Sequence, residues 1–170
     1  VRALLETLSL ANPAAFSRAS RVKGIVSELL TQMDVPDRWE IEVAASLSQV
    51  GAVALPPHVV EKLHRGSPLN EEEDEMVRRM PALAERLLSD IPRLDGVRTI
   101  IREQANWVTD TAPIGSKLLQ LAMDLDVLEA RDTPLDVAIQ HLKVRSKEYG
   151  EGAVRVLMTI RGDGAAQRSI

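Results

Sequence analysis

The chain has 170 residues and a net charge of −4 at pH 7, with three histidines and no cysteine. Without cysteine it cannot form disulfides, thiolate nucleophiles, thiolate-bound zinc or iron–sulfur clusters. Its acidic balance and few aromatic residues disfavour nucleic-acid binding, and no apolar run reaches the ~20 residues of a membrane span. We therefore expect a globular cytoplasmic protein with neither a nucleic acid nor a membrane as its partner.

Apolar residues recur at helical spacing in the first half of the chain. Asn12 and the proline after it separate the first two predicted helices, and Asp37 is expected to cap the third. Pro57, preceded by a second proline, predicts the start of a fourth helix, which Gly66 ends. Residues 52–55 are the one candidate for a short extended piece.

The same periodicity continues in the second half of the chain. Asn70 and Glu73 have the spacing of a capping box, so the acidic run at residues 71–75 is interpreted as a solvated, well-capped helix start. Pro81 restarts the helical pattern after this segment. We expect further helices at residues 97–107, 114–128, 134–146 and 149–159.

Together these elements predict an all-α fold without internal repeats. We expect a compact domain of seven to nine helices over residues 1–160, followed by a flexible C-terminal tail at residues 161–170. Because the chain begins at Val1 rather than at Met, we also expect it to be a segment of a longer protein.

The residues themselves form no recognisable catalytic constellation. Glycine-rich phosphate loops and the Gly-x-Ser-x-Gly elbow are absent. His58 and His64 lie six residues apart, which does not place them on one helical face, and His141 neighbours core candidates. Asp126 and Glu129 share a face, and we interpret them as capping or salt-bridging residues rather than a weak cation site. The residues alone therefore indicate an α-helical binding or scaffold module.

The order of several short motifs resembles the HD-GYP family, a branch of the HD-domain metal-dependent phosphohydrolases that hydrolyses cyclic di-GMP. Residues 44–56 (AASLSQVGAVALP) are similar to the segment that carries the family's His-Asp pair. Residues 68–73 (PLNEEE) resemble the capped helix start that follows it, and residues 117–126 (KLLQLAMDLD) resemble a helix that carries an aspartate ligand. The resemblance implies an HD-type fold over residues 1–160, with the non-catalytic HDOD branch as the competing assignment.

The positions where the resembled family carries its metal ligands hold other residues in this chain. An early histidine of the family falls on Arg18, and the His-Asp pair falls on Ser48 and Gln49. Such side chains do not supply the imidazole and carboxylate ligands that a binuclear iron or manganese site needs. We expect no bound metal or other cofactor, and a vestigial site formed by nine residues. They are Arg18, Ser48, Gln49, Ala52, Met80, Gln104, Ala105, Asn106 and Met123.

The resemblance implies a catalytically inactive HD-GYP-like module, the output or regulatory domain of a larger bacterial signal-transduction protein. We expect it to act by binding a protein partner. Binding of cyclic di-GMP without hydrolysis and formation of a homodimer are further options. The alternative hypothesis is an active metal-dependent phosphodiesterase whose atypical ligands are Asp124, Asp126 and Glu129.

Overall fold

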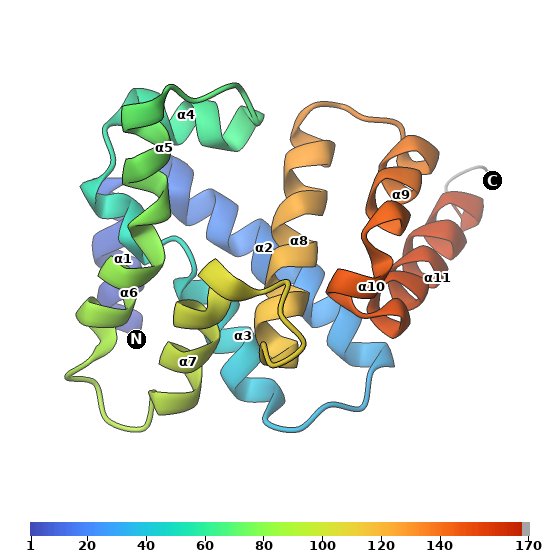
Figure 1. Ribbon diagram of the computed structural model, residues 1–170, viewed down its shortest axis with the longest axis horizontal. Helices are drawn as coiled ribbons and strands as arrows, with labels where there is room; N and C mark the ends of the chain where they lie inside the picture. The colour runs from blue at the N-terminus through green and yellow to red at the C-terminus, as the bar shows by residue number, and fades with distance from the viewer. Residues whose placement is uncertain (168–170) are drawn as a thin grey trace.

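The computed structural model describes the backbone of residues 1–167 and the side chains of residues 1–162, and within that range it contains no β-strand (Figure 1). The predicted all-α fold is confirmed. The elements in chain order are α1 (Arg2–Ala11), α2 (Pro13–Gln32), α3 (Arg38–Leu47), the 3₁₀ helix η1 (Val50–Ala54), α4 (Pro57–Arg65), α5 (Glu71–Arg78), α6 (Met80–Leu88), α7 (Asp95–Arg102), the 3₁₀ helix η2 (Glu103–Asn106), α8 (Ile114–Ala130), α9 (Leu135–Val144), α10 (Ser146–Tyr149) and α11 (Glu151–Gln167).

The predicted count of seven to nine helices is too low, because eleven α-helical segments occur in the described residues. The break between α5 and α6 falls at Arg79, close to the predicted restart at Pro81. The single-turn α10 was not predicted, and it is followed at once by Gly150, whose φ of 95° ends it.

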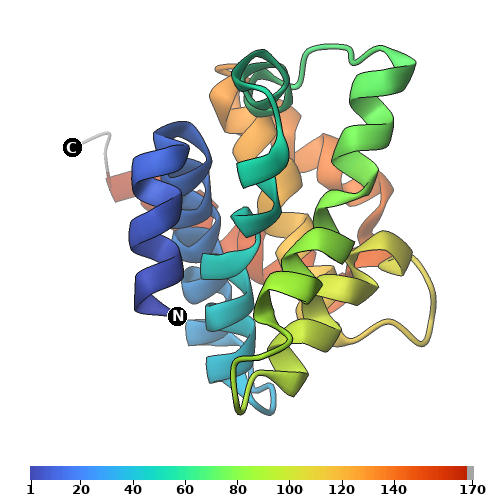
Figure 2. The same ribbon diagram turned by 90° about the vertical axis from the view of Figure 1, so that its left-hand side faces the viewer.

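Helices α2 and α8 form the centre of the domain. Helix α2 packs against α1, α3, α8 and α11, and α8 packs against α3 and against the α9–α10 segment. Figure 2 shows α3 and η1 lying between the α1–α2 pair on one side and α5–α7 on the other. This arrangement buries one continuous apolar core and leaves a space where α2, α3, α4, α6 and α8 converge.

Several helix boundaries form as the sequence predicts. The Asn12 side chain accepts a hydrogen bond from the amide of Ala15 at 3.0 Å and so caps α2. Gly66 ends α4 with a φ of 59°, a left-handed conformation that costs glycine little. The predicted capping box at the start of α5 is complete, since Asn70 and Glu73 each accept from the backbone amide of the other.

Two local predictions differ from the structure. Residues 52–54 belong to the 3₁₀ helix η1 and only Leu55 is extended, because the amides of Ala52 and Leu55 donate to carbonyls three residues earlier and close the turns. Asp37 precedes α3 as predicted, but it adopts a left-handed φ of 51° and makes no capping hydrogen bond within the described residues.

The end of the chain also differs from its prediction. The expected tail at residues 161–170 begins inside α11, which continues to Gln167. Arg161 anchors this helix by ion pairs to Glu28 and Glu129, at 3.3 and 3.5 Å. The flexibility of this segment stays a prediction, and residues 168–170 lie outside the described residues.

The acidic start of α5 is only partly solvated, contrary to its interpretation as a solvated face. Glu73 is buried, and both of its carboxylate oxygens lie 2.8 Å from Lys62 Nζ. The hydrogen bond from Lys62, followed by the one from the Asn70 amide, lowers the pKa of the Glu73 carboxyl. This carboxylate therefore joins α4 to α5, while Glu71 and Glu72 remain exposed.

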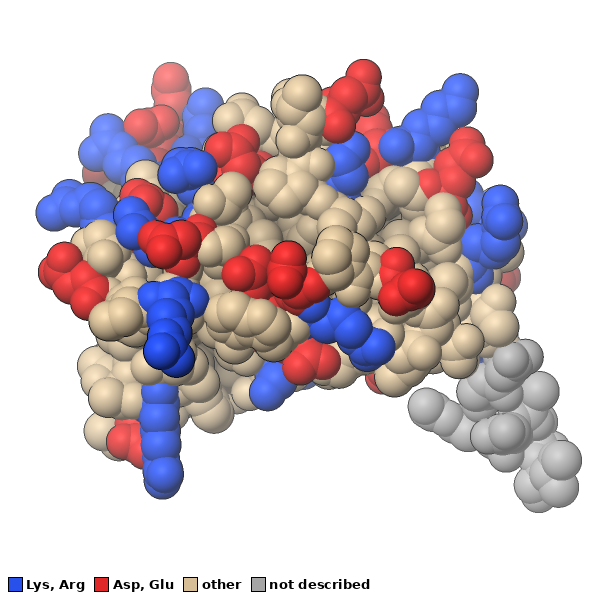
Figure 3. Space-filling model, turned by 90° about the horizontal axis from the view of Figure 1, so that it is seen from below, with Lys and Arg blue, Asp and Glu red and all other residues tan. Residues whose placement is uncertain are grey.

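The surface carries charges of both signs. On the face shown in Figure 3, the Lys and Arg side chains are interspersed with Asp and Glu, so this face forms no continuous basic patch. Among the helices that the structure describes, each is either too short or too polar to cross a bilayer.

Candidate functional site

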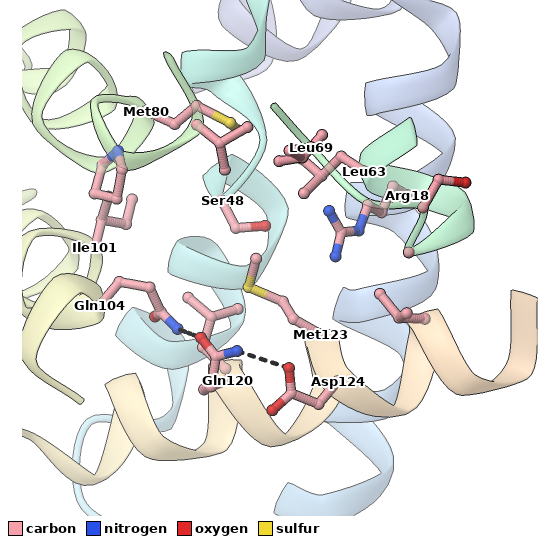
Figure 4. Close-up of a pocket in the computed structure, with 16 residues that line it drawn as sticks. Arg18, Ser48, Leu63, Leu69, Met80, Ile101, Gln104, Gln120, Met123 and Asp124 are labelled. Atoms are coloured by element: carbon pink, nitrogen blue, oxygen red, sulfur yellow. Dashed lines mark hydrogen bonds between the residues drawn. The ribbon is translucent and has the colours of Figure 1, made fainter. Parts of the chain in front are cut away.

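A cavity of about 370 Å³ lies where α2, α4, α6 and α8 converge near the end of α3 (Figure 4). Most of its wall is apolar, with Leu63, Leu69, Ile101 and Val127 among the lining side chains. Five of the nine residues of the predicted vestigial site line this cavity. They are Arg18, Ser48, Met80, Gln104 and Met123.

The other four predicted residues lie elsewhere. Gln49 and Ala52 are buried in the core around η1, because successive residues of a tight turn point in different directions. The Gln49 amide donates to the Ser48 hydroxyl at 3.3 Å. Ala105 and Asn106 are exposed on η2, so only Gln104 of that segment reaches the cavity.

Arg18 is the charged group of the cavity wall. Only 3% of its surface is exposed, and its guanidinium points into the cavity between Ser48 and Met123 in Figure 4. Its Nε lies 3.4 Å from Asp126, but Nε and Nη1 have no hydrogen-bond partner among the described residues. A buried donor without a partner costs about 1–3 kcal/mol, so this guanidinium is poorly satisfied by the protein.

Asp126 is engaged by a second arginine. Arg21 Nε lies 2.6 Å and Arg21 Nη2 lies 3.3 Å from its two carboxylate oxygens. Asp126 is only 1% exposed. Two guanidinium groups share this one buried carboxylate, and its shorter contacts are with Arg21 rather than with Arg18. Burial lowers the pKa of Arg18, and Asp126 opposes that shift, but a guanidinium stays protonated at neutral pH. The cavity wall therefore retains a positive charge.

A directional chain of hydrogen bonds follows the cavity wall and starts at Gln104, on the opposite side of the cavity from Arg18 (Figure 4). Gln104 Nε2 donates to Gln120 Oε1 at 2.7 Å, and Gln120 Nε2 donates to Asp124 Oδ1 at 2.8 Å. The Tyr149 hydroxyl donates to the other oxygen of Asp124. An ionised carboxylate only accepts, so Asp124 determines the direction of both amides. Gln104 Oε1 is thereby left as a buried acceptor without a partner in the described part of the chain.

Of the residues in this hydrogen-bond chain, only Gln104 was predicted from the sequence. Gln120 and Asp124 are four residues apart on α8, a spacing that places them side by side on a helix and could have identified the pair. Tyr149 gives no such signal, because it comes from a separate helix. Its ring stacks on Trp107 with centroids 4.9 Å apart, and Arg145 lies over the Trp107 ring at 4.5 Å.

His64 lies near Arg18 and Arg21 and carries no charge at neutral pH. Burial, followed by the positive charges of Arg18 and Arg21, lowers its pKa from 6.5 to about 4. Its Nε2 is buried without a hydrogen-bond partner among the described residues. The structure therefore places this histidine near Arg18, which lines the cavity.

We expect the His64 imidazole to titrate near pH 4 in a proton NMR titration of the folded protein. Since its folded pKa lies below its unfolded pKa, its contribution to stability is complete above pH 6.5 and is lost as the pH falls toward 4. Arg18→Met should raise the midpoint, because Arg18 is one of the groups that lowers it. Arg102→Met, which removes an exposed charge, should not. A midpoint near 6.5 in the unmodified protein would contradict the expected environment.

With this geometry established, comparison with known proteins identifies the family. A family model described as HD domain matches residues 2–151. The chain belongs to the HD domain family. Neither a curated protein nor a solved structure matches the chain. HD domains form a superfamily of metal-dependent phosphohydrolases, so the family implies a metal centre that must be tested against the residues of this cavity.

The cavity residues of this HD domain do not fit a divalent metal centre. Within the described residues, no group of three or more His, Asp or Glu side chains is placed to hold a metal ion. Each carboxylate of the alternative ligand set has other partners. Asp126 pairs with two arginines, Asp124 accepts from Gln120 and Tyr149, and Glu129 faces Arg161. Metal-assisted hydrolysis therefore has no ligand set in this part of the chain.

Proposed function

We propose that this HD domain is a catalytically inactive, HD-GYP-like signalling module that works by binding rather than by hydrolysis. The observation that carries the proposal is the buried guanidinium of Arg18 in the cavity wall. A divalent cation in the same cavity would meet a positive charge in surroundings of low dielectric, where like charges repel by several kcal/mol. The cavity thus has a cation of its own and favours anionic or neutral occupants.

Metal analysis together with a hydrolysis assay tests this proposal. The protein is purified, loaded with manganese or ferrous iron, desalted, and assayed on bis-nitrophenyl phosphate and on cyclic di-GMP. We expect metal well below one ion per chain and no hydrolysis above that of a blank. Two tightly held transition metals per chain, with hydrolysis that a chelator removes, would instead favour the alternative of an active phosphodiesterase.

The proposed mode of action is contact with a protein partner inside a larger cytoplasmic signalling protein. It is supported by two exposed valines on α9, Val137 and Val144, which are 50% and 86% exposed. They are seven residues apart and therefore lie on one face of the helix. Sedimentation of the protein and of Val144→Asp tests the homodimer form of this proposal. A dimer that the substitution dissociates would support it, and a monomer at all concentrations would leave a different protein as the partner.

A further inference from the structure

We propose that the cavity binds a small organic monocarboxylate with an apolar body and a hydrogen-bond donor at its far end. This inference rests on the proposed function, since it takes the cavity to be a binding site. The cavity volume of about 370 Å³ lies within the range of roughly 300–1,000 Å³ that is usual for small-molecule sites. Three independent parts of its wall define the ligand.

The anionic group is specified by Arg18. Its guanidinium is nine-tenths buried, points into the cavity, and has two nitrogens without a partner among the described residues. Arg21 holds Asp126 at 2.6 Å, whereas Arg18 is 3.4 Å from it, so the carboxylate compensates Arg18 less closely. A guanidinium fork matches the geometry of a carboxylate, and such charge-assisted hydrogen bonds are strong.

The charge balance of the wall limits the ligand to one negative charge. Arg18 and Arg21 share the buried carboxylate of Asp126, but Arg21 is half exposed and its charge is screened by solvent, so Arg18 is the cation that faces the cavity. Asp124 is the one carboxylate in the described lining, and its negative charge acts on Arg18 and would repel a second negative charge on a ligand. A dianion such as a phosphate monoester would bring a second charge that nothing in this wall balances, and burying an unbalanced charge is costly.

The far end of the ligand is specified by Gln104. Its Oε1 is the buried, unsatisfied acceptor of the hydrogen-bond chain that Asp124 orients, and Gln104 is one of the residues that line the cavity. A hydroxyl or amine on the ligand would satisfy this oxygen. Between the two polar ends Met123 lies between Arg18 and Gln104 in Figure 4, and Leu63 and Met80 add further apolar surface to the lining. An aromatic or branched aliphatic body is suited to this section.

Three matched probes test the inference on the unmodified protein by calorimetry in the presence of a chelator. Hydroxyphenylpropanoate carries all three elements, phenylpropanoate lacks the donor, and hydroxyphenylpropanol lacks the charge. We expect hydroxyphenylpropanoate to bind more tightly than the alcohol by about tenfold or more, and more tightly than phenylpropanoate by several-fold. Phenyl phosphate tests the charge limit and should bind more weakly than either carboxylate.

Substitutions locate the contacts. Arg18→Met should weaken binding of hydroxyphenylpropanoate by about tenfold or more, whereas Arg102→Met removes an equal charge outside the lining and should leave it unchanged. Gln104→Met should remove the preference for the hydroxylated probe without affecting phenylpropanoate. Should Arg18→Met fail to fold, the comparison among the probes on the unmodified protein still decides the question.

The outcomes separate this inference from the function on which it rests. Three results would each overturn the ligand class. They are no binding of any probe, equal binding of the alcohol and the carboxylate, and tighter binding of phenyl phosphate than of the carboxylates. A protein without metal or hydrolysis that also fails to bind carboxylates would retain the proposed function and lose only this inference. Stoichiometric metal with hydrolysis would overturn both.

Discussion

Replacing Asp126 by asparagine is expected to lower the free energy of unfolding by about 3–5 kcal/mol. Asparagine has nearly the same shape, so packing is preserved and only the charge is removed. The variant leaves the buried guanidinium of Arg18 with no counter-ion in contact, beside the positive charge of Arg21. Urea unfolding at neutral pH measures the loss in the free energy of unfolding. If the slope of this free energy against urea concentration is unchanged, the substitution has not altered the unfolded state.

Three further variants separate charge from structure. Asp110→Asn removes an exposed carboxylate between η2 and α8 and should change stability by less than about 0.5 kcal/mol. Arg18→Met should be close to the unmodified protein or more stable, because Asp126 keeps its contacts with Arg21 and an unsatisfied buried ion is removed. The double variant that combines Arg18→Met with Asp126→Asn should lose less free energy of unfolding than Asp126→Asn alone. A single Asp126→Asn that costs under about 1 kcal/mol would contradict the role of this cluster.

Gly51→Ala is expected to destabilise the domain by about 2 kcal/mol or more. A methyl group at this position would collide with the carbonyl of Met80 and lie 3.0 Å from its Cα. Both groups belong to the backbone, so a change of side-chain rotamer cannot relieve the collision, and α6 must shift relative to η1. Because Met80 lines the cavity, this variant should also weaken the binding of any ligand in the cavity.

Gly24→Ala provides the matched control with the opposite expected sign. Gly24 is exposed in the interior of α2, and a methyl group there would meet no heavy atom within 4 Å in the described structure. Alanine is the better helix former, so this variant should gain about 0.5–1 kcal/mol. Thermal or urea unfolding of the two variants measures both effects. A cost for Gly51→Ala no larger than about 0.5 kcal/mol would show that α6 moves freely against η1.

Much of the fold could be predicted because its boundaries depend on local chemistry. The caps at Asn12 and Asn70 and the left-handed Gly66 act within a few residues, so their effects are visible in a single sequence. The extent of α11 was missed for the opposite reason. Its last turns contain glycine and few apolar residues, and Arg161 is anchored by residues of α2 and α8 that are far away in the chain.

The candidate site could likewise be predicted from the sequence only in part. The resemblance to a known family directed attention to Arg18 and Met123, and the structure places both in one cavity. It gave no information on which of two consecutive residues faces that cavity, so Gln49 was grouped with Ser48. The pairing of Arg21 with Asp126 spans 105 residues and depends on the packing of α2 against α8, which spacing along the chain does not report.

The hydrogen-bond chain from Gln104 to Tyr149 has a consequence for communication across the domain. Each amide in it has a single allowed orientation, so Gln104 cannot turn over without placing its oxygen against the oxygen of Gln120. A ligand that displaced Gln104 would leave Gln120 Oε1 without its donor, and the same chain continues through Asp124 to Tyr149 in α10, which directly precedes α11. Continuous hydrogen bonds thus connect the cavity to the helical turn that leads into α11.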